Sequence, residues 1–137
     1  MIVSDITELK LMAVLERGSP NLECIAIQAK ERINLGQYGI MIANYAYKNG
    51  AFPFRDNLFW FGDGIIEKND WVFVFTGSGE PRQNTAYDKK SNIYTIFWGK
   101  PTTIFAQTNI VPILFRIDAA EIMPPPIDMP QIRKLDN

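Results

Sequence analysis

Apolar side chains alternate with a period of two residues in several short segments of this chain, and glycine, proline or polar residues separate the segments. Such alternation is typical of strands that bury one face, and short strands divided by turn signals are typical of sandwiches and barrels. The segments with this pattern are residues 9–17, 22–29, 33–45, 93–99 and 111–118. The sequence therefore predicts an all-β fold.

The first segment has a rival interpretation. Leu9, Leu11, Ala13 and Leu15 would share one face of a strand. The many helix formers between residues 8 and 16 favour a helix instead. We predict the strand because the alternation extends over the whole segment.

Further along the chain the pattern also predicts which side chains are buried. Ile25 and Ile27 are expected on the core face of one strand, and Ile40 and Ile42 on the core face of the next. Residues 71–76 (WVFVFT) are apolar on both faces, so this strand is expected to be central or covered.

Other regions are predicted to lie outside the sheets. Residues 50–57 are expected to form a loop because Pro53 bars a central strand position, and residues 77–92 form a long polar excursion. Pro112 marks a strand start or an edge. The proline-rich residues 124–137 are expected to form an extended or disordered tail after one domain that spans residues 1–123.

The composition excludes several classes of function. The chain of 137 residues has no histidine, which rules out Ser-His-Asp and Cys-His devices and zinc sites that rely on imidazole. Its one cysteine, Cys24, cannot form an intrachain disulfide and is expected to be a buried, inert thiol. The net charge of −1 supplies no broad basic field for nucleic acid.

Nothing in the sequence indicates a membrane segment or a secretory signal. No apolar run approaches the ~20 residues that span a bilayer, and the N-terminus has no apolar h-region. We therefore expect a soluble, cytoplasmic protein, and we expect no cofactor.

The order of the segments resembles the lamin-tail domain family. The matching stretches are LECIAIQA, INLGQYGIMI, FPF, DWVFVFTGSGE and YTIFWG, and they fall within residues 9–123. The chain departs from the family near its last strand, where Gln107, Thr108 and Asn109 stand in place of an Asn-x-Gly-Asp turn. The resemblance implies an immunoglobulin-like β-sandwich of about seven to nine strands that serves as an interaction module, without shared catalytic residues.

The stretch TGSGEP at residues 76–81 is the first candidate site. A phosphate-binding loop needs successive backbone N–H groups at the start of a helix, usually with a lysine. Here Pro81 removes a donor and no helical pattern follows. We interpret Gly77 and Gly79 as turn residues that need a positive φ, rather than as a nucleotide site.

The second candidate is a group of carboxylates, Asp56, Asp63, Glu67 and Asp70, which could form a metal site. Their spacing does not match a calcium loop, so turn and surface roles are favoured. Lys89 and Lys90 form a third candidate, with Arg82, Lys100, Tyr87 and Tyr94 nearby in sequence, because aromatic and basic side chains together can hold single-stranded nucleic acid. Without excess positive charge, a solvated loop is favoured.

The aromatic residues Phe59, Trp60 and Phe61 are the strongest candidate. Three adjacent side chains cannot all point inward from a strand, so at least one is expected to be exposed or covered by a loop, and we predict that the segment faces a partner. We therefore predict a non-catalytic module that binds another protein or a second copy of itself, with no membrane partner and no nucleic acid. The alternative is a small hydrolase or nuclease-associated factor that uses Asp63, Asp70 or Glu80 with a divalent cation.

Overall fold

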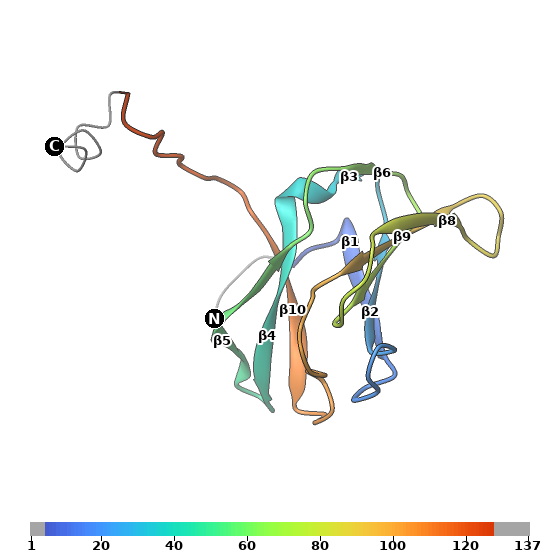
Figure 1. Ribbon diagram of the computed structural model, residues 1–137, viewed down its shortest axis with the longest axis vertical. Helices are drawn as coiled ribbons and strands as arrows, with labels where there is room; N and C mark the ends of the chain where they lie inside the picture. The colour runs from blue at the N-terminus through green and yellow to red at the C-terminus, as the bar shows by residue number, and fades with distance from the viewer. Residues whose placement is uncertain (1–4, 128–137) are drawn as a thin grey trace, which may run out of the picture.

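The structure of the protein is a computed structural model that describes residues 5–127. These residues form ten strands and one turn of 3₁₀ helix, and they contain no α-helix. Within this described range, no helix could cross a bilayer. Two main sheets face each other in a β-sandwich-like arrangement (Figure 1). The prediction of an all-β fold is confirmed.

The larger sheet has five strands in the order β1-β2-β7-β9-β8. Its strands are β1 (Leu9–Leu15), β2 (Cys24–Ala29), β7 (Trp71–Phe75), β8 (Arg82–Thr85) and β9 (Asn92–Phe97). Neighbouring strands are antiparallel except for β7 and β9, which run parallel. The strand β7 is central, as its apolar residues predict.

The smaller main sheet has the order β10-β4-β5 and is antiparallel. Its strands are β4 (Tyr38–Ala46), β5 (Gly50–Trp60) and β10 (Ile110–Arg116). A third sheet consists of β3 (Ile33–Asn34) and β6 (Ile65–Ile66), with the 3₁₀ turn η1 (Leu35–Gln37) after β3. The two main sheets thus contain eight strands, within the seven to nine expected, and the two-residue strands add a further pair.

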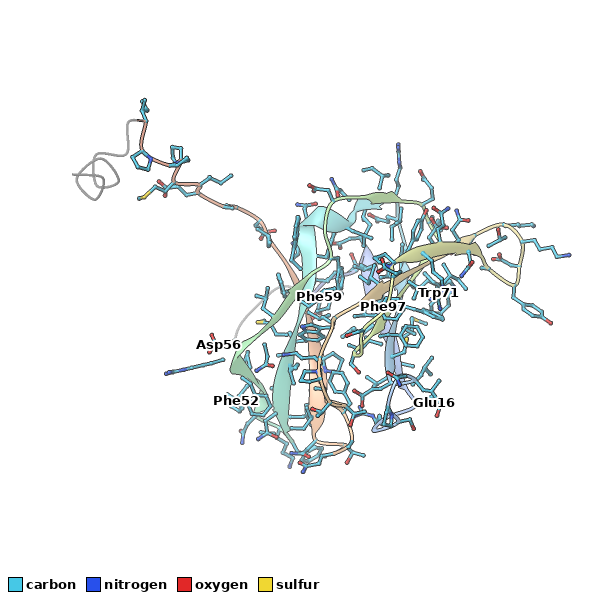
Figure 2. All side chains as sticks on the ribbon, viewed as in Figure 1. Glu16, Phe52, Asp56, Phe59, Trp71 and Phe97 are labelled. Carbon is cyan, nitrogen blue, oxygen red and sulfur yellow. The ribbon has the colours of Figure 1, made fainter. Side chains whose placement is uncertain are left out.

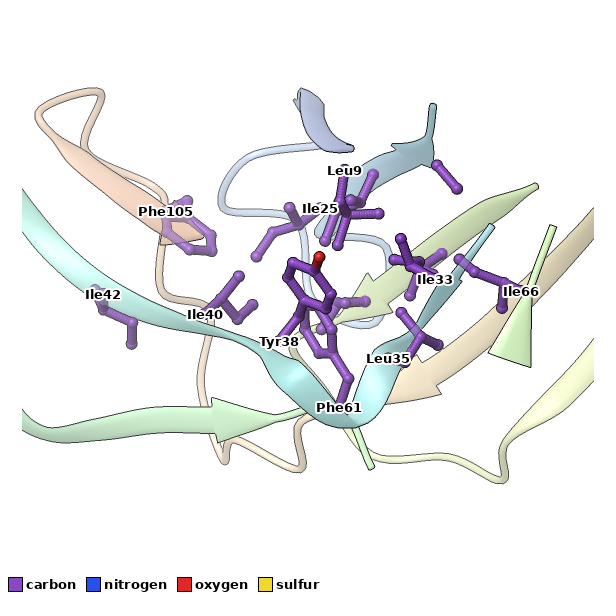
Figure 3. Packing of buried hydrophobic residues seen from close by; sticks show 14 residues of the cluster. Leu9, Ile25, Ile33, Leu35, Tyr38, Ile40, Ile42, Phe61, Ile66 and Phe105 are labelled. Carbon is purple, nitrogen blue, oxygen red and sulfur yellow. The ribbon is translucent and has the colours of Figure 1, made fainter. Parts of the chain in front are cut away.

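The hydrophobic core lies between the two main sheets (Figure 3). Ile25 and Ile27 from β2 meet Ile40 and Ile42 from β4, and all four are buried as predicted. The fully buried ring of Phe105 comes from the connection between β9 and β10. This connection therefore belongs to the core although it contains no strand.

The first segment is a strand, as predicted, but its side chains do not keep to one face. The pairing of β1 with β2 shifts between Leu11 and Ala13. A shift of one residue exchanges the two faces of a strand. Leu9 therefore points inward, whereas after the shift Ala13 and Leu15 point outward and Val14 packs against the core. The expectation that Leu9, Leu11, Ala13 and Leu15 share a face is wrong.

Residues 50–57 do not form a loop, contrary to the prediction. They are the first part of β5, and Pro53 lies opposite Ala43 of β4. Proline fits there because β5 is an edge strand, where a missing N–H leaves no partner unsatisfied. The pairing shifts between Met41 and Ala43, so residues 54–57 bulge out of the ladder around Asp56.

The polar excursion at residues 77–92 contains a strand that the sequence does not reveal. The strand β8 consists of Arg82, Gln83, Asn84 and Thr85, which are all exposed and so show no alternation. At the other end of the domain, residues 117–127 form no strand or helix and leave the sheets (Figure 1). The rest of the predicted tail, residues 128–137, lies outside the described residues.

A single buried carboxylate fastens three connections of the sandwich. Glu23 is 1% exposed, and its carboxylate accepts hydrogen bonds from four donors. These are the backbone N–H groups of Gly18 (2.8 Å), Ile104 (2.7 Å) and Phe105 (2.9 Å) and the hydroxyl of Thr76 (2.9 Å). Burial raises the pKa of Glu23, but the hydrogen bonds outweigh it and hold the pKa below its usual value.

We predict that Glu23→Gln lowers the free energy of unfolding by about 3 kcal/mol, although it preserves the shape of the side chain. Each carboxylate oxygen accepts two hydrogen bonds, so the new NH₂ group must face at least one backbone N–H. Urea denaturation measures the change. The matched control, Glu31→Gln at an exposed position, should change it by no more than about 0.5 kcal/mol. Equal stability of the two variants would contradict the prediction.

A second carboxylate joins the two main sheets at one side. Glu8 precedes β1, and its Oε1 accepts hydrogen bonds from the Tyr38 hydroxyl of β4 at 2.6 Å and from Arg116 Nη1 of β10 at 2.7 Å. The hydrogen bond from Tyr38 has the largest effect and lowers the pKa of Glu8. Burial raises the pKa, the hydrogen bond from Arg116 lowers it further, and the net result is a pKa of about 2. The folded chain therefore holds this proton less tightly than the unfolded chain.

This shift predicts an acid dependence of stability. Because the folded-state pKa of Glu8 is depressed, its stabilising contribution is present above about pH 4.5 and is lost as the pH falls toward about 2. Tyr38→Phe removes the largest cause, so the drop in unfolding free energy between roughly pH 6 and pH 3 should be smaller in the variant. Urea denaturation at both pH values decides. An unchanged drop would show that Tyr38 does not set this pKa.

Candidate functional site

The aromatic segment predicted to contact a partner is divided by the pleat of β5. Phe61 is buried, and Phe59 stacks on Trp98 with ring centroids 5.4 Å apart. Trp60 points the other way and is 48% exposed. Its Nε1 donates to the carbonyl oxygen of Gly36 at 2.7 Å, which fixes the orientation of the indole. Of the three residues, Trp60 is thus the one available to a partner.

Trp60 belongs to a wider apolar surface on the outside of the three-stranded sheet. The registers of β4 with β5 and β10 place six larger apolar side chains there, on the side opposite the core residues Ile40 and Phe59. We call this surface the uncharged face, because none of its members carries a charge. It consists of Met41, Leu58, Trp60, Val111, Ile113 and Phe115.

Gly39 lets the uncharged face lie flat. A Cβ atom at this position would collide with the ring of Phe115 and with the carbonyl oxygen of Phe59. The ring of Phe115 therefore lies across the backbone of β4, beside Trp60 of the next strand. The sequence could not identify this surface. Both faces of β10 carry apolar residues, so its pattern does not show which face is buried.

The glycine stretch at residues 77–79 follows β7 and leads to β8. Because β9 lies between those two strands, the loop must cross the end of β9. Its backbone is paired with the segment after β9, since Gly99 N–H donates to the carbonyl of Gly77 at 2.9 Å. No helix follows within the described residues, so the loop lacks the helix N-terminus on which a phosphate site depends.

The reason given for the two glycines is wrong, because neither Gly77 nor Gly79 has a positive φ. Gly79 is required by close approach instead. A Cβ atom there would lie 2.5 Å from the ring of Phe97, whereas one at Gly77 would meet only the Asn21 side chain, at 3.4 Å. The constraint comes from the crossing over β9, which the local sequence does not reveal.

The predicted carboxylates do not come together: Asp56, Asp63 and Glu67 are exposed, and Asp70 is buried in a structural role. Asp70 is 2% exposed, and its carboxylate accepts hydrogen bonds from the backbone N–H groups of Glu67 (2.9 Å) and Asn92 (2.8 Å). Among residues 5–127, no three acidic or cysteine side chains are placed to hold a metal ion. The thiol of Cys24 is buried, as expected, and burial raises its pKa to about 12.

The structure does not gather the predicted basic residues into one patch. Lys100 Nζ donates to Asn57 Oδ1 at 2.9 Å and lies 5.3 Å from the centroid of Trp98. Arg82 lies on β8 with its guanidinium 5.7 Å from the centroid of Phe97. Lys89 and Lys90 lie in the turn between β8 and β9.

Two open clefts flank the sandwich. One, of about 400 Å³, lies between β5 and the connection before β10, and Lys100 is the charged residue in its lining. The other, of about 450 Å³, separates β1 from β10 and is lined mainly by aliphatic side chains. The first contains no carboxylate or cysteine, and neither brings together a nucleophile and a base.

Comparisons of the chain with protein-family models, with curated proteins and with solved structures found no match. The resemblance to lamin-tail domains therefore stays a prediction from the quoted motifs. Among residues 5–127, the geometry offers the exposed uncharged face.

We predict different outcomes for alanine at the two glycines. Gly79→Ala should lower the free energy of unfolding by about 1–3 kcal/mol, because the new methyl group collides with Phe97. Gly77→Ala should be neutral or slightly stabilising, since its backbone is compatible with alanine. Urea denaturation tests both. In the double variant Gly79→Ala/Phe97→Ala, the collision is gone and the cost of Gly79→Ala should largely disappear. Equal costs at the two glycines would contradict this explanation.

Proposed function

We propose that the protein is a non-catalytic protein-interaction module and that the uncharged face is its contact surface. The observation that carries the proposal is a sheet face whose paired outward positions carry no charge, with Leu58 57% and Trp60 48% exposed. Apolar patches of this kind in water are typical of interaction sites, and central interface positions are depleted in charge and enriched in aromatic residues and methionine.

We infer that the partner is a second copy of this chain. Two uncharged faces can meet about a two-fold axis without bringing like charges together, as an isologous contact requires. Trp60 and Phe115 supply the aromatic anchors that commonly dominate such contacts. The hydrogen bond from Trp60 to Gly36 holds the indole in place before association, which reduces the entropy lost on binding.

We also propose that the body is an immunoglobulin-like sandwich of the lamin-tail kind. This is supported by the quoted motifs, which fall on β2, β4, β7 and β9 of two facing sheets. Domains of this class act as interaction modules without shared catalytic residues, which agrees with the function proposed here.

Sedimentation velocity over a wide concentration range tests the contact. We expect the unmodified protein to form dimers, and Trp60→Ala to weaken the dimer about 30-fold, as the loss of an interface tryptophan worth about 2 kcal/mol predicts. Its melting temperature at low concentration should stay close to that of the unmodified protein, because the indole lies outside the core.

A matched pair of leucines supplies the control. Leu58 on the uncharged face and Leu22 in the turn before β2 are both 57% exposed. Leu58→Glu should leave a folded monomer, whereas Leu22→Glu should associate like the unmodified protein. A protein that stays monomeric at the highest concentrations, or two variants that associate equally, would overturn the proposal.

A further inference from the structure

A second exposed face, on the outside of the five-stranded sheet, has a different chemistry. The registers place four aromatic side chains on it, on the side opposite the core residues Val72 and Val74. They are Trp71, Phe73, Phe75 and Phe97, all half-buried. We call this surface the aromatic face; Figure 2 labels Trp71 and Phe97 on it.

The charged side chains on the aromatic face are all positive. Lys10 of β1 pairs with Gln28 of β2, and Gln28 pairs with Trp71 of β7, so Lys10 lies on the same face as Trp71. Arg82 of β8 pairs with the outward Thr95 of β9, so it lies on this face as well. Lys30 joins them, because its Nζ donates to Gln28 Oε1 at 2.8 Å. None of the outward positions of the five strands carries a carboxylate.

Acidic residues border both ends of the face. At the Trp71 end, the exposed Glu31 follows Lys30 and the buried Asp70 precedes Trp71. Two others lie at the opposite end. Glu16 follows the last residue of β1, and Glu80 follows Gly79 in the loop that crosses Phe97. Figure 2 shows Glu16 beyond the lower end of the sheet, away from Trp71. At the Trp71 end, the turn between β8 and β9 adds the exposed Lys89 and Lys90, together with Asp88, whose carboxylate is occupied by the backbone N–H groups of Lys90 and Ser91. The positive charge is therefore spread along the face, with Lys10 and Lys30 toward Trp71 and Arg82 against Phe97.

This charge pattern disfavours a second copy as the occupant. Two aromatic faces brought together would oppose cations from both copies without a carboxylate to pair them, which costs free energy. The partner must be anionic, and the exposed rings require that it also present flat apolar groups. Single-stranded nucleic acid has both, since its bases stack on aromatic side chains while its phosphates contact lysine and arginine.

We propose that the aromatic face binds single-stranded nucleic acid. Bases stack on Trp71 and Phe73, whose rings lie 5.9 Å apart at 80°, while the loop at Gly79 covers Phe97. Phosphates lie against Lys10, Lys30 and Arg82. Three phosphate contacts predict a slope of about −2 for log affinity against log salt, so binding is weak and suited to low salt. The proposal differs from our sequence-based expectation of no nucleic acid, which weighed the net charge and the candidate around Lys89 and Lys90 but not the faces of the sheets. It is independent of the uncharged face.

The test uses the full chain and a fluorescently labelled 12-nucleotide oligo-dT, with oligo-U of the same length in parallel. Fluorescence anisotropy at low salt should show saturable binding, and bound bases should quench tryptophan emission. Trp71→Leu should weaken binding about tenfold and remove most of the quenching. Lys10→Glu/Arg82→Glu should weaken it at least tenfold without loss of fold, because both residues are exposed.

Controls separate this ligand from other anions. Lys48→Glu and Arg55→Glu, at exposed positions on and beside the other sheet, should bind like the unmodified protein. Inorganic polyphosphate, which has no bases, should bind more weakly than oligo-dT. Binding of polyphosphate as tight as that of oligo-dT would overturn the proposal in favour of a simple anion surface. Tighter binding of polyglutamate would overturn it in favour of an acidic protein partner, and an absence of quenching would rule out stacking on Trp71.

Discussion

The carboxylate of Glu23 is the interaction on which the arrangement of the sandwich most depends. It lies where the turn after β1, the end of β7 and the connection before β10 meet, and it accepts a hydrogen bond from each. That connection carries Phe105, which is fully buried in the core. Without a buried acceptor, the backbone N–H groups of Ile104 and Phe105 would be unsatisfied, and the connection could not enter the core at such low cost. One polar side chain thereby allows an irregular segment to complete a hydrophobic interior.

The two sheets have opposite surface chemistry on one shared core. The paired outward positions of the three-stranded sheet carry no charge, whereas those of the five-stranded sheet combine aromatic rings with cations and no carboxylate. Among the described residues, Asp56 lies in the bulge of β5 and every other acidic residue lies outside the strands. Such segregation gives the molecule two surfaces that select partners by different forces: burial of apolar area on one side, and charge with stacking on the other.

Alternation of apolar residues predicted the fold class, the central position of β7 and the burial of residues such as Ile25 and Ile40, because burial of one face imposes a period of two. It failed where pairing departs from regularity. The shift between Leu11 and Ala13 exchanges the faces of β1, and the polar strand β8 has no buried face to leave a pattern. The candidate surfaces were harder still. The pleat predicted that at least one of Phe59, Trp60 and Phe61 points away from the core, but not which one. The two wider faces arise from registers between strands distant in the sequence, and the need for Gly79 arises from a crossing over β9.

The bulge in β5 affects more than the local ladder. Pro53 has no N–H to offer a neighbouring chain, and residues 54–57 around Asp56 break the straight row of backbone groups along that edge. At the corresponding edge of the other sheet, β8 presents only polar side chains and an arginine. Exposed edges normally invite strand-by-strand growth into fibrils, and both of these edges resist it. At these two edges association is directed to contacts between faces, which can close after two copies instead of propagating without limit.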